Sequence, residues 1–98
     1  MQIGEVTGSF EMHYVYILRS ETSGRFYVGS SQDVQKRLGC HNSGGVKSTR
    51  YLRPLVVAYV ESHATAQEAR QRESYLKRQK SHKFLEQLIG TGVVSSVG

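Results

Sequence analysis

The chain has 98 residues, enough for one domain, and its single cysteine, Cys40, excludes an internal disulfide. No apolar run is long enough to cross a membrane, no Cys/His spacing is typical of zinc, and no signal peptide is recognisable, so we expect a cytoplasmic protein, or a nuclear one if the source has a nucleus. A net charge of +5 and a pI near 9.6 favour a polyanionic partner.

The first part of the chain is expected to form a β-hairpin. Residues 1–11 lack periodicity and are expected to be a flexible leader. Residues 13–19 and 25–30 are rich in β-branched and aromatic side chains, and a turn that closes at Gly24 separates them. The pattern predicts two antiparallel strands.

A helix and a loop are expected next. Ser31 is the expected N-cap of the helix, with Asp33 favouring its first turn. Three residues at helical spacing share one face: Val34, Leu38 and His41. From Asn42 the chain is rich in Gly, Ser and basic residues, which predicts a loop as far as Arg53 and Pro54.

The last part of the chain is expected to form one strand and two helices. Residues 55–61 are the strongest strand of the sequence, and the pair Thr65 and Glu68 predicts a capping box that opens a helix to about Gln79. Ser81 is the expected cap of a final helix that ends at Gly90, with this apolar face: Phe84, Leu85, Leu88 and Ile89.

The element order is therefore β-β-α-β-α-α. We expect an α/β (α+β) fold, a compact three-stranded sheet flanked by three helices, with the domain at residues 12–89 and a flexible tail at 90–98.

Basic residues form two blocks. Residues 25–53 contain six Lys and Arg against Asp33 alone, and residues 70–83 contain six against Glu73 alone. Such blocks are typical of nucleic-acid-binding domains, although a solvated surface has the same composition. Charge alone leaves both interpretations open.

A carboxylate interrupts the apolar face of the helix predicted before Gln79. One stripe at helical spacing contains Ala66, Ala69, Glu73, Leu76 and Lys80. Because a buried carboxylate is costly unless it is paired or bound to a metal, Glu73 is either a salt-bridge partner of an arginine or a metal ligand at the floor of a cleft.

Two further groups of residues have a structural and a functional interpretation. Arg37 and His41 are four residues apart and project from one helical face, which is either a solvated basic face or part of a site. Tyr14, Tyr16 and Tyr27 lie in the predicted hairpin, where tyrosines commonly serve packing.

The tyrosines form two short motifs, YVY at residues 14–16 and YVG at residues 27–29, separated by ten residues. With Arg37 ten residues after Tyr27, His41 soon after it and Glu73 in the later helix, the pattern resembles the GIY-YIG nuclease superfamily. The resemblance covers roughly residues 12–89 and is closest to the small stand-alone members. The chain differs at Tyr14, where the motif has glycine, and at Ser30, where the DNA-repair excision nuclease subunit has lysine.

The resemblance implies a metal-dependent endonuclease that hydrolyses phosphodiester bonds in DNA, with a role in DNA repair. Tyr27 is implied as general base, Tyr16 as the group that positions water or phosphate, and Arg37 as the phosphate ligand. Glu73 is implied as the ligand of Mg²⁺ (or Mn²⁺), while His41 assists proton transfer or contacts phosphate. A free tyrosine titrates near pH ~10, so a nearby cation or the metal would have to lower the pKa of Tyr27.

Substrate binding is expected to extend to the basic loop, which otherwise is an ordinary solvated loop. Its candidate nucleic-acid ligands are Lys47, Thr49, Arg50 and Arg53. The alternative function is a non-catalytic nucleic-acid-binding module of the same fold. The sequence does not distinguish DNA from RNA, and a domain this small suggests that a protein partner or the substrate's shape supplies specificity.

Overall fold

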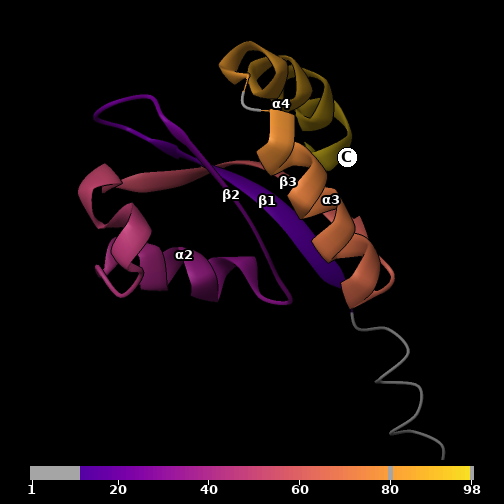
Figure 1. Ribbon diagram of the computed structural model, residues 1–98, viewed down its shortest axis with the longest axis horizontal. Coiled ribbons are helices and arrows are strands. Elements are labelled where there is room, and N and C mark those ends of the chain that lie inside the picture. The colour runs from indigo at the N-terminus through magenta and orange to yellow at the C-terminus, as the bar shows by residue number, and fades with distance from the viewer. Residues whose placement is uncertain (1–11, 80, 98) are drawn as a thin grey trace, which may run out of the picture.

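The chain folds into a three-stranded antiparallel sheet with helices on both faces (Figure 1). The computed structural model describes residues 12–79 and 81–97, with side chains as far as residue 90. The strands are β1 (His13–Ser20), β2 (Phe26–Ser31) and β3 (Leu55–His63), in the order β2-β1-β3. The helices are α2 (Val34–Asn42), the short 3₁₀ helix η1 (Lys47–Leu52), α3 (Ala66–Gln79) and α4 (His82–Val97). The expected α+β fold and its β-β-α-β-α-α order are confirmed, and no helix of the described residues is long and apolar enough to cross a membrane.

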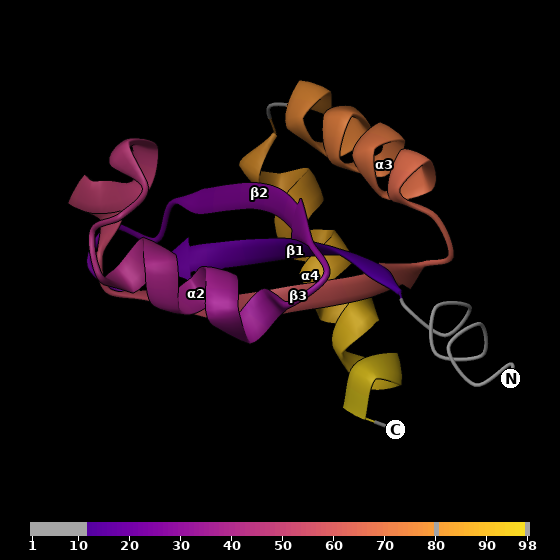
Figure 2. The ribbon, with the colours of Figure 1, turned by 90° about the horizontal axis from the view of Figure 1, so that it is seen from below.

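The central strand β1 contributes to two separate cores, one on each face of the sheet. Figure 2 shows α2 and α3 on opposite sides of the sheet. Val15 and Ile17 pack with residues of α3 and α4, whereas Tyr16 and Leu18 pack with residues of α2 and β3. All four side chains are at most 1% exposed. This division follows from the strand itself, because successive side chains point to opposite faces.

The start of α2 differs from the prediction by two residues. Asp33, not Ser31, is the N-cap, and its carboxylate accepts a hydrogen bond from the Lys36 N–H at 3.0 Å. Ser31 belongs to the end of β2, where its hydroxyl accepts a hydrogen bond from the Asp33 N–H at 3.0 Å. The predicted cap was wrong because the backbone is still part of strand β2 at Ser31, and the helix begins only after Asp33.

The region predicted as a loop after Asn42 is partly helical. η1 occupies Lys47–Leu52, and the Asn42 side chain fixes the two ends of the segment. Its amide nitrogen donates to the Leu55 carbonyl at 2.9 Å, and its oxygen accepts from the Leu55 N–H at 2.8 Å. The end of α2 is therefore held against the start of β3.

The helices α3 and α4 begin where the sequence predicts. The Thr65 hydroxyl accepts from the Glu68 N–H at 3.1 Å, and the Ser81 hydroxyl accepts from the Phe84 N–H at 3.1 Å. The prediction that the last helix ends at Gly90 was wrong, because α4 continues to Val97. Gly90 does not adopt the positive φ with which glycine commonly ends a helix. The leader predicted at residues 1–11 lies outside the described residues.

A candidate active site at the edge of β2

A chain of three buried polar side chains links β1, α2 and η1. The Tyr16 hydroxyl lies 3.3 Å from Nε2 of His41, and Nδ1 of His41 lies 2.8 Å from the Thr49 hydroxyl. Since Thr49 donates to the Val46 carbonyl at 3.3 Å, its oxygen accepts from His41 Nδ1–H. Nε2 is then left as the acceptor for the Tyr16 hydroxyl.

Burial keeps the side chains of Tyr16, His41 and Thr49 uncharged. It lowers the pKa of the His41 imidazole, and the positive charge of Arg37 lowers it further. Burial also raises the pKa of the Tyr16 hydroxyl, against the lowering effect of its hydrogen bond with Arg37. The same bond is the main cause of the raised pKa of Arg37, which therefore stays cationic. Tyr16 is thus a protonated donor to a neutral histidine, with a guanidinium beside it.

Gly29 is required by the position of the Tyr16 ring. The two residues are directly opposite each other in the β1–β2 ladder. A Cβ atom on Gly29 would lie 2.6 Å from the Tyr16 hydroxyl oxygen and 2.7 Å from the ring carbon that bears it. Only a residue without a side chain allows the phenol to lie across the backbone of β2 at this point.

Tyr27 lies on the same face of the sheet as Tyr16, two residues before Gly29 in β2. Its ring packs edge-on against the His41 imidazole, with the ring centroids 4.9 Å apart. The ammonium of Lys77 lies 6.0 Å from the centroid of the Tyr27 ring. Tyr27 is half-buried. One side of its ring contacts the buried His41 imidazole, and another side faces the Lys77 ammonium of α3.

Glu73 reaches the same place from the opposite face of the sheet. Its carboxylate accepts a hydrogen bond from the Ser30 hydroxyl at 2.6 Å and pairs with the Lys77 ammonium at 2.7 Å. Because β2 is an edge strand, side chains from both faces can meet around it. Glu73 is close enough to Tyr16 to influence the pKa of its hydroxyl, with Arg37 and Tyr27 acting on the same group.

The residues around Glu73 fit one type of metal site. The described residues contain no group of three or more His, Cys, Asp or Glu side chains that could enclose an ion. Glu73 offers a carboxylate whose side chain is 20% exposed, with the Ser30 hydroxyl beside it. A single, partly exposed carboxylate suits Mg²⁺, which keeps several of its waters, and does not suit zinc.

Five of the residues predicted from sequence come together around the β2 edge. They are Tyr16, Tyr27, Arg37, His41 and Glu73. His41 is 0% exposed, so no phosphate can reach its ring, and its contacts make it a positioning group for Tyr16.

The loop residues are placed less uniformly. Thr49 is fully buried, and its side chain holds His41 rather than facing solvent. Lys47, Arg50 and Arg53 are exposed. Arg50 donates through Nε to the Gly44 carbonyl at 3.2 Å, and Arg53 donates through Nε to the Arg50 carbonyl at 2.9 Å. Both arginines thus fold back onto the loop.

Sequence reasoning missed Ser30 and Lys77 as neighbours of Glu73. Lys77 had a signal, because Glu followed by Lys four residues later is a common helical ion pair. Ser30 had none, because it lies 43 residues from Glu73 and only the packing of α3 against β2 brings them together.

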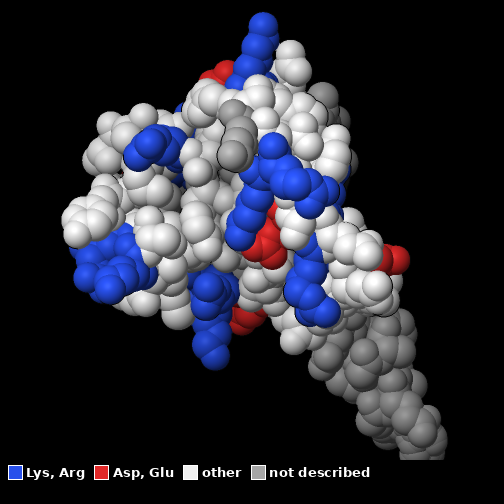
Figure 3. All heavy atoms as spheres, in the orientation of Figure 1, with Lys and Arg blue, Asp and Glu red and all other residues white. Residues whose placement is uncertain are grey.

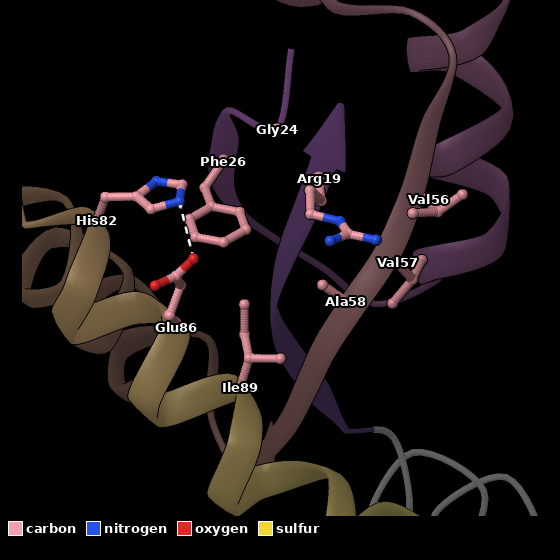
Figure 4. Close-up of a pocket in the computed structure, with 9 residues that line it drawn as sticks. All are labelled: Arg19, Gly24, Phe26, Val56, Val57, Ala58, His82, Glu86 and Ile89. Carbon is pink, nitrogen blue, oxygen red and sulfur yellow. Dashed lines mark ion pairs between the residues drawn. The ribbon is translucent and has the colours of Figure 1, made fainter. Parts of the chain in front are cut away.

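A separate hollow of about 540 Å³ lies between the ends of β1 and β3 and helix α4 (Figure 4). The His82 ring stacks on Phe26 at a centroid distance of 4.3 Å, and His82 pairs with Glu86 at 3.2 Å. Arg19 lines the other side of the hollow (Figure 4). None of the residues that line this hollow belongs to the group of Tyr16, Tyr27, Arg37, His41 and Glu73. We therefore do not take the hollow as the candidate active site.

The chain is similar to known proteins over most of its length. The model of the GIY-YIG catalytic domain matches residues 12–86. A UPF0213 protein of Bacillus pumilus is 42% identical over 80 residues, which cover 78% of this chain and 81% of that protein. A UPF0213 protein of Streptococcus pneumoniae serotype 4 is 40% identical over 68% of each chain. The solution NMR structure of a UPF0213 protein of Bacillus halodurans has a TM-score of 0.50 and 34% identity, covering 82% of this chain and 84% of that one.

Proposed function

The chain belongs to the GIY-YIG catalytic domain family, and we propose that it is a divalent-metal-dependent endonuclease that hydrolyses phosphodiester bonds in DNA. One observation carries this proposal. A tyrosine, an arginine and a carboxylate meet around the edge of β2 although they come from three different elements: Tyr27, Arg37 and Glu73. Pure nucleic-acid binding has no use for a partly buried carboxylate placed among cations.

In the proposed reaction Arg37 binds the scissile phosphate. Its guanidinium is exposed on α2 and stays cationic beside Tyr16. A guanidinium can donate two parallel charge-assisted bonds to phosphate oxygens, and these bonds strengthen as negative charge develops. Tyr16, which is held by the buried side chains of His41 and Thr49, keeps the guanidinium in place.

Tyr27 is proposed as the general base that takes a proton from the attacking water. The water oxygen forms a bond to phosphorus, the P–O bond to the leaving oxygen breaks, and that oxygen takes a proton from solvent water. Tyr16 is poorly suited to this role, because its hydroxyl already donates to His41 and burial raises its pKa. Tyr27 has an accessible side, which an incoming water can approach.

Glu73 would hold Mg²⁺ or Mn²⁺, with the Ser30 hydroxyl as its neighbour. Such an ion supplies charge neutralisation at phosphate and activation of water when it is bound. The hydrogen bond with Glu73 raises the pKa of the Lys77 ammonium, so Lys77 stays cationic beside the carboxylate.

A cleavage assay with Glu73→Gln tests the proposal. We expect wild-type protein to nick supercoiled DNA with Mg²⁺ or Mn²⁺ and not with EDTA. Glu73→Gln should abolish cleavage while DNA binding stays intact or tightens, because the change removes both the metal ligand and a negative charge facing phosphate. Glu68→Gln, which removes one exposed charge from the same helix, is the matched control and should cut normally.

Two results would contradict the proposal. A Glu73→Gln protein that melts at a lower temperature yet still cuts would reject Glu73 as the metal ligand and make it a structural salt-bridge partner. Wild-type protein that binds DNA but does not cut with either metal would support the alternative, a non-catalytic binding module of the same fold.

A further inference from the structure

The outward side of α3 forms a polar surface that the proposed reaction does not use. A shallow hollow of about 520 Å³ runs along it, lined by Gln67, Arg70, Gln71, Ser74 and Arg78. We refer to these five residues as the α3 ridge. Its lining contains two arginines and two amides, with no carboxylate among them.

None of the five side chains has a hydrogen-bond or ion-pair partner within the part of the chain that the structure describes. Arg72, on the other side of the same helix, instead pairs with Glu61 at 2.9 Å. The two arginines of the basic loop, Arg50 and Arg53, each donate one hydrogen bond to a loop carbonyl. The side-chain donors of the α3 ridge are therefore free for a bound anion.

The α3 ridge is continuous with the candidate active site. Arg70 lies three residues before Glu73 and Lys77 four residues after it, so both flank the carboxylate on the helix surface. Arg70 also lines a second hollow of about 270 Å³ together with Ser30, the hydrogen-bond partner of Glu73. Figure 3 shows Lys and Arg side chains gathered over α3 around a small acidic area on this face.

The spacing of the ridge suits a polyphosphate backbone. Arg70, Ser74 and Arg78 follow each other at intervals of four residues, which places them in one row along the helix. At about 1.5 Å per residue the two arginines are about 12 Å apart along the axis. Successive phosphates of one DNA strand rise by about 3.4 Å along the duplex axis, so the row can face several phosphates.

We propose that the α3 ridge binds the phosphate backbone of duplex DNA next to the scissile bond, with Arg70 and Arg78 as its ionic contacts. The proposal rests on the proposed endonuclease function for the position of the scissile bond. It moves the main flanking contact from the basic loop, which the sequence favours, to the surface of a helix.

Binding of a short fluorescent DNA duplex in EDTA tests this surface without cleavage. The test variant is Arg70→Gln/Arg78→Gln, since both positions are exposed and glutamine keeps a good helix propensity. The comparison variant in the loop is Arg50→Gln/Arg53→Gln. The charge-matched control is Arg19→Gln/Lys83→Gln, at exposed positions on β1 and α4. Thermal melts check that all variants are folded.

Each phosphate contact contributes about 0.9 to the slope of log K against log salt concentration. The ridge variant should therefore lower the magnitude of the slope by about 1.8 and weaken binding at 0.1 M salt by about 60-fold. The control should stay within about twofold of wild type. An unchanged slope and affinity in the ridge variant, or a loss confined to the loop variant, overturns the proposal.

The outcomes separate this proposal from the endonuclease itself. If the wild-type protein binds the duplex through the α3 ridge but never cuts with Mg²⁺ or Mn²⁺, the surface is supported and the endonuclease is rejected. If it cuts and the ridge variant binds and cuts as well as wild type, the endonuclease is supported and the surface is rejected. Failure of wild-type protein to bind the duplex at low salt overturns the surface.

Discussion

Gly29→Ala should destabilise the protein and disorganise the candidate site at the same time. The added methyl group would lie 2.6 Å from the Tyr16 hydroxyl oxygen, a separation that real Cβ contacts essentially never have. Tyr16 is 1% exposed and is held by His41, so its ring has little room to withdraw. Either the hairpin backbone shifts or the bond between Tyr16 and His41 breaks.

Overpacking of this kind costs about 1–3 kcal/mol. For a domain of this size each kcal/mol lowers the melting temperature by about 4–8 °C, so a decrease of about 5–20 °C is expected. Urea denaturation and thermal melts followed by circular dichroism measure both quantities. Gly39→Ala is the matched control, because a Cβ there meets nothing within 4 Å in an exposed turn of α2. It should stabilise the protein by up to about 1 kcal/mol.

The double variant Tyr16→Phe/Gly29→Ala identifies the clash. Removing the hydroxyl eliminates the nearest atom while the ring carbon at 2.7 Å remains, so the clash is relieved in part and the double variant should lose less stability than the sum of the two single losses. Tyr16→Phe alone leaves Nε2 of buried His41 without its donor and should cost about 1–3 kcal/mol. The proposed packing of Tyr16 over Gly29 would be refuted if the stability losses of the two single variants simply add in the double variant. It would also be refuted if Gly29→Ala were as stable as wild type.

Two further predictions concern Tyr27 and His41. Tyr27→Phe should slow single-turnover cleavage about 10²–10⁴-fold with an unchanged melting temperature, and a loss below about tenfold would remove Tyr27 as general base. Because burial lowers the pKa of His41, the unfolded chain takes up its proton first, so stability should be highest above about pH 6.5 and fall as the pH drops below it. Urea unfolding from about pH 7 to 5 should give a slope of up to about 1.4 kcal/mol per pH unit that His41→Asn reduces, and equal slopes in the two proteins would contradict the lowered pKa.

Local patterns predicted the elements and most of the residues that gather at the candidate site, because each signal acts within a few residues. The hairpin, the caps at Thr65 and Ser81, and the helical phase that sets Glu73 beside buried Leu76 are all local. The sequence predicts Thr49 as a nucleic-acid contact because it lies among basic loop residues. Its burial depends on η1 folding back onto His41, a contact between elements that residue types alone do not specify.

The position of the site at an edge strand explains how uncharged and charged groups can work side by side. On the α2 face the buried side chains of Thr49, His41 and Tyr16 share hydrogen bonds without net charge, so burial costs them little. On the α3 face Glu73 and Lys77 remain partly exposed, where water can reach their ion pair. β2 is paired on one side only, so the two faces are separated by a single strand at this edge. A strand paired on both sides would instead place another backbone between the two groups.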